Sequence, residues 1–216
     1  LANNTGKEGN AASDRSSQIP SWLRDNDDYW HSDNYSGSSD SNRKQMTRGP
    51  IGMPDLNTGN KDLQDYIIKY LNDLQDCGVD GFRFDAAKHI ETPDDGGDNC
   101  ASDFWPTVIN GIREYADHEL FIYGEILNTP GDNFSINNYT KYMSVTDSAT
   151  GNNIRNAIAG GNASAACNPG ISNGASPSKT VQWNESHDTY YADNDSIWIS
   201  NDNMKKTWAI VGSRAE

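Results

Sequence analysis

The fold is decided by one stretch of the sequence, Gly78-Val79-Asp80-Gly81-Phe82-Arg83-Phe84-Asp85-Ala86-Ala87-Lys88-His89. Residues 79–85 are too few, and too interrupted by Gly81, to form a helix, so we predict a strand there. Side chains alternate along a strand, which puts Arg83 and Asp85 on one face and the two phenylalanines on the other. A guanidinium and a carboxylate therefore point the same way where the strand ends.

Two more polar residues, Lys88 and His89, follow this strand end at once. The structural alternative is that Arg83 and Asp85 form a buried ion pair with no chemical role. We favour a functional site, because four polar side chains gather where a strand gives way to a loop.

A helix precedes this strand. Apolar residues recur there at intervals of three and four, which is the period of one helix face. They are Leu63, Tyr66, Ile67, Tyr70, Leu71 and Leu74. Gly78 comes just after the last of them, where a glycine in the left-handed conformation commonly ends a helix.

Strands and helices alternate through the rest of the chain. Apolar and aromatic runs predict further strands at residues 120–125, 142–145 and 180–185. Helical spacing predicts helices at 104–115, 153–159 and 203–211, the last ending at Gly212, with a loop from about 160 to 178. Such alternation is typical of an α/β fold with a parallel sheet and right-handed crossovers.

Three carboxylates follow three of these strands: Asp85, Glu125 and Asp188. In barrels of parallel strands the carboxyl ends of the strands meet over one mouth. Like charges in one place cost free energy, so their gathering suggests a function. For Asp188 the alternative is a helix N-cap ahead of Thr189.

The first 57 residues differ from the rest in composition, with little periodicity and much Asn, Asp, Ser and Gly. They contain an aromatic cluster, Trp22, Tyr29, Trp30, His31 and Tyr35. A small local core and a ligand-stacking surface are both open explanations for it. We predict a separate excursion over residues 1–57 and an α/β domain over 58–216.

Composition narrows the partners. The 216 residues carry a formal net charge of −14, which argues against nucleic acid and anionic membranes and favours a neutral or cationic ligand. No apolar run approaches the roughly 20 residues that cross a bilayer. The cysteines, Cys77, Cys100 and Cys167, match no zinc or redox spacing, and a Cys100 to Cys167 disulfide stays open.

Four motifs together resemble those of the α-amylase family of retaining glycoside hydrolases, whose (β/α)8 barrels act on α-glucans. Residues 81–89 resemble its second signature, Gly124-Glu125-Ile126 its third, and Glu185-Ser186-His187-Asp188 its fourth. Met53-Pro54-Asp55-Leu56-Asn57 resembles the additional motif that closes the family's B domain.

The resemblance implies a partial TIM barrel, about strands four to seven, in residues 58–216. Residues 1–57 would then be part of an irregular B domain. A whole barrel takes about 250 residues, and the family's first signature is expected upstream of Leu1. We therefore expect an internal fragment that is inactive by itself.

The resemblance also assigns roles. Asp85 would be the nucleophile, ionised beside Arg83, and Glu125 the proton donor, with apolar neighbours and the charges of Asp85 and Asp188 opposing its ionisation. Retaining enzymes hold these two carboxyl groups about 5–5.5 Å apart. Asp188 would hold the sugar hydroxyls. Further substrate contacts are implied for Arg83, Lys88, His89 and His187.

One Ca²⁺ is implied, with Asp55 and the backbone carbonyl of His89 among its six to eight oxygen ligands. Asp55 could instead be a loop acid before a helix. Ser186 stands where chloride-binding relatives carry Asn, which disfavours chloride activation. The resemblance further implies an extracellular monomer acting on starch and maltooligosaccharides. A transglycosylase and a non-catalytic glucan-binding relative are the alternatives.

Overall fold

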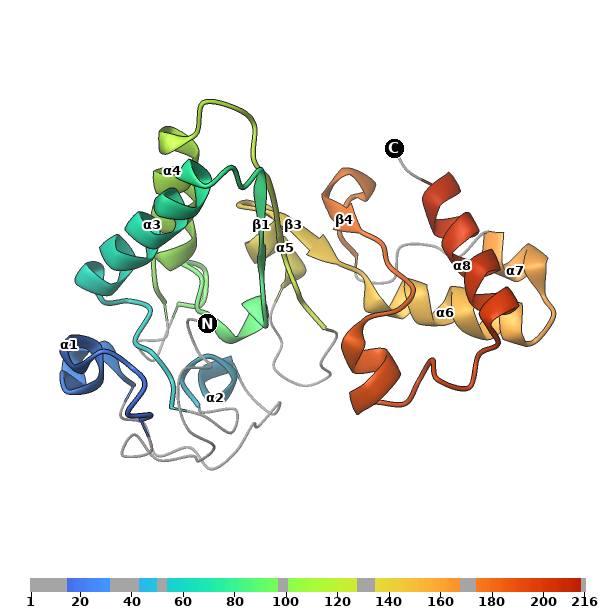
Figure 1. Ribbon diagram of the computed structural model, residues 1–216, viewed down its shortest axis with the longest axis horizontal. Coiled ribbons are helices and arrows are strands. Elements are labelled where there is room, and N and C mark those ends of the chain that lie inside the picture. Colours follow the sequence, from blue (N-terminus) through green and yellow to red (C-terminus); the bar gives the residue numbers. More distant parts are fainter. Residues whose placement is uncertain are drawn as a thin grey trace. The chain divides into compact units, whose positions relative to one another are not determined.

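The computed structural model describes residues 15–31, 43–49, 54–96, 101–127, 135–167 and 174–214 (Figure 1). Contacts divide the chain into two compact units. The first comprises Leu1–Glu125 and Thr129–Tyr142, and the second comprises Ile126–Asn128 and Met143–Glu216. Each unit contains one parallel strand pair. Over the described ranges, no helix combines the length and apolar character that crossing a membrane requires.

Unit 1 contains seven helical segments and two strands among its described residues. The helices are α1 (Ser21–Arg24), η2 (Asp27–Tyr29), α2 (Arg43–Arg48), α3 (Lys61–Asp76), η3 (Ala87–His89), α4 (Phe104–Tyr115) and α5 (Ile136–Thr140). The strands are β1 (Gly81–Phe84) and β2 (Phe121–Gly124). They pair in parallel, and α3 and α4 lie side by side next to them (Figure 1).

Helix α3 confirms the helix predicted before the decisive strand. Its first turn is capped by Asn60, whose side chain accepts a hydrogen bond from Leu63 N at 3.1 Å. It ends at Asp76, and Gly78, which follows the C-cap residue Cys77, has φ +88°, the left-handed conformation predicted for it.

The predicted buried face of α3 is partly wrong. Tyr66 and Tyr70 are 49% and 54% exposed, whereas Gln64 is buried. Gln64 donates to the Thr58 carbonyl at 2.8 Å and to Asp103 Oδ1 at 3.1 Å, so a polar side chain occupies the inner face with its hydrogen bonds satisfied.

Strand β1 sits where the sequence predicts it. Gly81 pairs with Phe121, and a Cβ on Gly81 would lie 2.2 Å from the Phe121 carbonyl oxygen, so only glycine fits. On the other side of the strand, Phe84 packs edge-on against Trp105 with ring centroids 5.2 Å apart. The apolar residues of α4 form the core beneath: Phe104, Trp105, Val108, Ile109 and Ile112.

Unit 2 contains β3 (Ser144–Thr146), α6 (Ser148–Ala159), α7 (Ala163–Cys167), η4 (Pro177–Lys179), β4 (Thr180–Val181), η5 (Asp188–Ala192) and α8 (Asn201–Ser213). Strands β3 and β4 pair in parallel, with Val145 opposite Thr180. The helices α6, α7 and α8 pack around Ile154, Ile158 and Ala166 (Figure 1).

Several expectations for unit 2 are wrong. Helix α7 lies inside the predicted loop, and β4 is shorter than the predicted strand at 180–185. Helix α8 continues through Gly212 to Ser213, because glycine lowers helix propensity by only about 1 kcal/mol and does not by itself end a helix.

The aromatic residues near the start do form a local core. Tyr29 and Trp30 are buried with Leu56 and Leu63, and Trp30 Nε1 donates to the Leu23 carbonyl at 2.8 Å. Trp22 is different, since it is 45% exposed. Tyr35 lies outside the described residues.

The cysteines are described only in part. Cys77 and Cys167 are free, exposed thiols. Cys100, the other partner of the disulfide considered above, lies outside the described ranges.

Candidate active site

The register of β1 and β2 brings two of the predicted carboxylates together. Phe84 lies opposite Gly124 in this parallel pair, so Asp85 and Glu125 are the next residues of two adjacent strands. Backbone hydrogen bonds continue past the strand ends, from Glu125 N to the Phe84 carbonyl at 2.8 Å and from Ala87 N to the Glu125 carbonyl at 2.9 Å. Neighbouring strands therefore present both acids at one edge.

Arg83 lies between the two acids. Its Nη1 donates to Asp85 Oδ1 at 2.6 Å, and its Nη2 pairs with Glu125 Oε1 at 2.9 Å. The Asp85 side chain is 47% exposed and that of Glu125 is 12% exposed. One guanidinium thus fixes both carboxylates, one open to solvent and the other mostly covered.

The neighbours of Arg83 stabilise its positive charge. Partial burial opposes it, but the hydrogen bond to Asp85 and the charge of Glu125 together raise the pKa of the guanidinium above its usual value. Sequence reasoning placed Arg83 beside Asp85 but missed its contact with Glu125. That contact depends on the register between β1 and β2, which the spacing of residues along one strand does not reveal.

The residue after Asp85 has a strained backbone. Ala86 lies in the left-handed region with φ +47°, where residues other than glycine are uncommon. This conformation lets Ala86 N donate to Glu125 Oε2 at 3.1 Å. The strained backbone conformation of Ala86 therefore helps to orient the Glu125 carboxylate. Backbone outliers at functional sites often have such a role.

Helix α2 holds the segment that contains Lys88 and His89. Arg43 Nη1 donates to the Lys88 carbonyl at 2.6 Å, and His89 Nδ1 lies 2.9 Å from the Met46 carbonyl. The guanidinium of Arg43 also forms a two-pronged ion pair with Asp95. Lys88 is buried and His89 half-buried. Sequence analysis missed Arg43, because nothing local marks a contact with a residue 45 positions away.

Asp55 is buried and has a protein partner. Its Oδ2 lies 2.6 Å from His31 Nδ1, and His31 Nε2 lies 3.5 Å from Glu91 Oε1. Burial raises the pKa of Glu91, although the charge of His31 opposes that shift. Asp55 does precede α3, which Asn60 caps.

These residues do not form a calcium site by themselves. In the part of the chain that the structure describes, no group of three or more His, Cys, Asp or Glu residues is arranged to hold a metal. Calcium binds six to eight oxygens, so a site that included Asp55 and the His89 carbonyl would need further ligands.

His187 and Asp188 stand at the start of η5 in unit 2. The His187 side chain is 71% exposed, and its Nε2 lies 3.4 Å from Asp188 Oδ1. Ser186 and Thr189 cap this turn reciprocally, since Thr189 Oγ1 accepts from Ser186 N at 2.9 Å and Ser186 Oγ accepts from Thr189 N at 3.3 Å. Asp188 is the first residue of η5 and His187 is its N-cap residue, so the helix-cap role considered for Asp188 is not seen.

Helix α6 fixes the chain just before this turn. A Cβ on Gly151 would lie 2.1 Å from the Trp183 carbonyl oxygen, so the helix and this segment approach as closely as glycine permits. One turn later, buried Arg155 donates to the Asn184 carbonyl. Two residues of one helix therefore hold the backbone that leads to His187. Sequence analysis singled out neither.

Comparison with known proteins identifies the family. A family model described as the alpha amylase catalytic domain matches residues 12–168. The alpha-amylase of Clostridium acetobutylicum is 38% identical over 176 residues, which is 81% of this chain and 22% of that protein. The alpha-amylase of Butyrivibrio fibrisolvens is 32% identical over 214 residues, covering 87% of this chain and 22% of that protein. This chain thus spans about a fifth of the length of these relatives.

Solved structures show the same fold. Alpha-amylase I from Eisenia fetida superposes with a TM-score of 0.60 at 19% identity, over 85% of this chain and 39% of that chain. A complex of a mutant of that protein with maltohexaose gives 0.57 at 19% identity, over 76% of this chain and 34% of that chain. With the parallel strand pairs, this likeness shows an α/β fold of the TIM-barrel type. The family model covers most of the sequence, and this chain therefore belongs to the alpha-amylase family.

Proposed function

We propose that this chain is part of an α-amylase that hydrolyses α-1,4-glucosidic bonds of starch and related glucans with retention of configuration. The observation that carries the proposal is the contact of Arg83 with both Asp85 and Glu125 at adjacent strand ends. Two carboxylates within reach of one guanidinium suit a retaining enzyme, whose carboxyl groups lie about 5–5.5 Å apart. Inverting enzymes need a wider gap, because a water must fit between acid and sugar.

In the proposed first step, an Asp85 oxygen attacks the anomeric carbon and forms a glycosyl ester. The bond from that carbon to the glycosidic oxygen breaks, and Glu125 gives its proton to the leaving oxygen. In the second step Glu125 takes a proton from water, and the resulting hydroxide displaces Asp85 from the sugar. Each side chain returns to its starting state, so no other reactant is needed.

The other residues bind and orient. Arg83 would keep the Asp85 carboxylate aimed at the sugar, and the amide of Ala86 would hold Glu125. By family resemblance, Asp188 and His187 would bind hydroxyls of the sugar that reacts. Lys88 and His89 would contact the next sugar along the chain.

A wider architecture follows from the same resemblance. We propose that the described strands are strands four to seven of a (β/α)8 barrel, with residues 1–57 as part of the B domain. The chain alone would then be inactive, since the sugar pocket would need residues from outside it. An extracellular location belongs to the same proposal.

Calcium enters as one ion that would join the B domain to the barrel. Asp55 and the His89 carbonyl would be two of its oxygen ligands, and residues outside this chain would supply the rest. Chelation should therefore lower the thermal unfolding temperature of the full-length protein, and Asp55→Asn should reduce that response. An unfolding temperature that EDTA leaves unchanged would contradict the calcium proposal.

The proposed activity is tested by incubating the full-length protein with soluble starch. New reducing ends indicate hydrolysis. Constant reducing ends with altered chain lengths would indicate a transglycosylase, and binding without any change would indicate a non-catalytic relative. Either of the last two results would overturn the proposal.

The nucleophile is tested by Asp85→Asn in the same protein. The amide cannot form the glycosyl ester, so nearly all turnover should disappear while the far-UV circular dichroism stays unchanged. Turnover within about tenfold of the starting enzyme would refute the assignment.

A further inference from the structure

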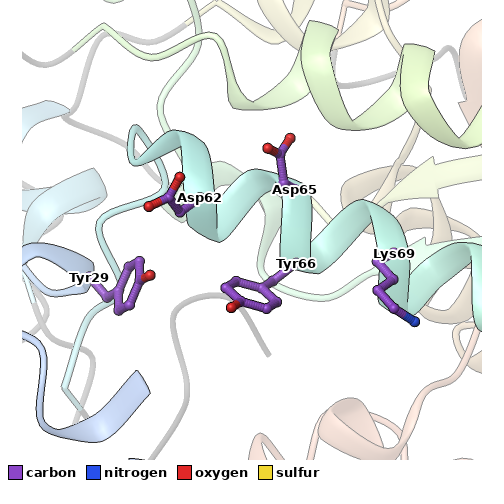
Figure 2. A pocket seen from close by; sticks show the side chains of 5 residues that line it. All are labelled: Tyr29, Asp62, Asp65, Tyr66 and Lys69. Atoms are coloured by element: carbon purple, nitrogen blue, oxygen red, sulfur yellow. The ribbon is translucent and has the colours of Figure 1, made fainter. Parts of the chain in front are cut away.

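A pocket outside the candidate active site lies along α3. Its volume is about 310 Å³, and it is lined by Tyr29, Asp62, Asp65, Tyr66 and Lys69 (Figure 2). Four of these residues belong to one solvent-facing side of α3, and Tyr29 comes from the N-terminal segment. The volume lies at the small end of the range for ligand sites, which suits one or two sugar rings better than a long ligand.

The aromatic rings of this pocket are held in place. Trp22 stacks on Tyr66 with ring centroids 4.2 Å apart and planes 30° apart, and it meets Tyr29 edge-on at 5.9 Å. Tyr29 is itself anchored in the local core. Trp22 and Tyr66 nevertheless remain 45% and 49% exposed. Exposed rings fixed by neighbours can bind a flat ligand with little loss of conformational entropy.

Polar groups surround these rings. In Figure 2, Asp62 lies at the end of the pocket near Tyr29, and Lys69 projects from the same side of α3 as Tyr66. Lys69 is held at 2.8 Å by Asp73, one turn further along the helix. Burial, followed by the charge of Asp62, raises the pKa of Tyr29, so its hydroxyl stays protonated and can donate a hydrogen bond.

This combination selects a class of ligand. A hexose ring has an apolar face that can stack on tyrosine and a rim of hydroxyls that can donate to carboxylates. An anionic ligand would be repelled by two aspartates and by a chain of formal net charge −14. The pocket therefore fits a neutral sugar with hydroxyls in the ring plane.

We propose that this pocket binds a glucosyl unit of an α-glucan chain, separately from the candidate active site. This inference rests on the proposed function, because a polymer of glucose offers many equivalent units to a second site. A second contact on the same polymer raises the effective concentration of the chain near the enzyme and slows its release. The pocket would thus strengthen the binding of long glucans and polysaccharide surfaces, but not that of short oligosaccharides.

The test uses the full-length protein with Glu125→Gln, so that glucan is not consumed during binding. Affinity for soluble starch is measured by retardation in gels that contain it, first for this background and then with Tyr66→Ala added. Loss of the ring should weaken the affinity about three- to tenfold, as expected for one aromatic contact. Tyr70→Ala is the matched control: Tyr70 lies on the same helix, is 54% exposed and does not line the pocket, so starch affinity should not change.

Asp62→Asn provides a second variant that keeps the ring stack, and it decides the matter if Tyr66→Ala fails to fold. It should weaken starch binding at least about twofold, because an amide accepts sugar hydroxyls less strongly than a carboxylate. Equal affinities of background, Tyr66→Ala and Asp62→Asn would overturn the pocket. The proposal would also be overturned if choline, an organic cation, bound to the pocket and glucan did not compete with it.

Failure of the pocket can be told apart from failure of the proposed function. If the unsubstituted protein hydrolyses starch while the pocket variants bind it equally well, only the pocket is refuted. If the unsubstituted protein neither binds nor hydrolyses starch, both are refuted.

Discussion

At the scale of single residues, Arg83 has the most consequential contacts of the candidate site. It is the one side chain seen to touch both Asp85 and Glu125 in the described part of the chain. The planar guanidinium offers two terminal nitrogens in a fixed geometry, and each meets a different carboxylate. A lysine ammonium carries the same charge at a single point and cannot reproduce both contacts.

Arg83→Lys should therefore reduce the kcat of the full-length enzyme on soluble starch by about 10- to 100-fold, the loss expected from a displaced catalytic group. Unfolding temperature should change little, because Arg83 is partly exposed. Arg113→Lys is the control, since Arg113 makes an exposed contact with the Tyr142 carbonyl in the same unit. Equal kcat values for Arg83→Lys and the unsubstituted enzyme would show that Arg83 does not orient the acids.

Residue patterns predicted some of this site and not the rest. The alternation of side chains was enough to place Arg83 beside Asp85 and the phenylalanines opposite. The left-handed Ala86 carried no signal, because glycine is the residue expected there. Tyr66 and Tyr70 matched the helical period but are exposed, because a tyrosine contributes to an apolar pattern whichever way its ring faces.

At the scale of elements, α6 positions the segment that leads into His187 and Asp188. Gly151 permits its contact with the Trp183 carbonyl, and Arg155 adds a hydrogen bond one turn later. The prediction of a helix near residue 153 was right in kind but began too late. Asp147 starts the helix by accepting from Thr150 N at 3.1 Å, and Gly151 lies within its first turns.

Gly151→Ala should destabilise the protein by about 1–3 kcal/mol, because the new methyl group would clash with backbone that cannot rotate away. Chemical denaturation of the full-length protein measures this. Gly212→Ala is the matched control within a helix: a Cβ there meets nothing within 4 Å, so alanine should stabilise by about 0.5–1 kcal/mol. If both variants shift stability in the same direction, the contact between α6 and residue 183 is not tight.

Helices α3 and α4 are joined by a polar contact that should depend on pH. Lys61, at the start of α3, donates to Asp103, the residue just before α4, and this hydrogen bond is the main reason that the pKa of Asp103 lies below its usual value. A depressed pKa in the folded protein contributes stability above the unfolded pKa. That contribution is lost as pH falls through the folded pKa.

Asp103→Asn should thus lower the free energy of unfolding near neutral pH by at most about 1 kcal/mol, because the pair is largely exposed. Below both pKa values of Asp103 the two proteins should be equally stable. Denaturant titrations across the acidic range measure the difference. A deficit that persists unchanged into strong acid would mean that the charge of Asp103 plays no part.

Elements with long periodic patterns were predictable, and short ones were not. Helix α4 buries a continuous apolar stripe, and spacing located both α3 and α4, although two tyrosines in the α3 pattern are exposed. Helix α7 has five residues in a stretch rich in Asn, Gly and Ala, and its position depends on packing against α6 and α8. Strand β4 was predicted too long because residues 182–185 alternate like a strand but leave the parallel pair after Val181.

At the scale of the whole molecule, family membership rests on a family model that matches residues 12–168. Arg83, Asp85 and Glu125 lie in unit 1, and His187 and Asp188 lie in unit 2. Spacing in the sequence cannot tell how carboxylates from different strands are oriented. The parallel register of β1 and β2 supplies that information for Asp85 and Glu125.

The central claim is that Asp85 forms a covalent bond to the sugar while Glu125 handles the proton. The most direct measurement is to treat the full-length enzyme with a fluorinated α-glucosyl fluoride, which forms the intermediate faster than water removes it. Peptides are then weighed by mass spectrometry. We predict one added fluoroglucosyl group, on the peptide that carries Asp85. An active enzyme with this group on another residue, or with no adduct at all, would contradict the account.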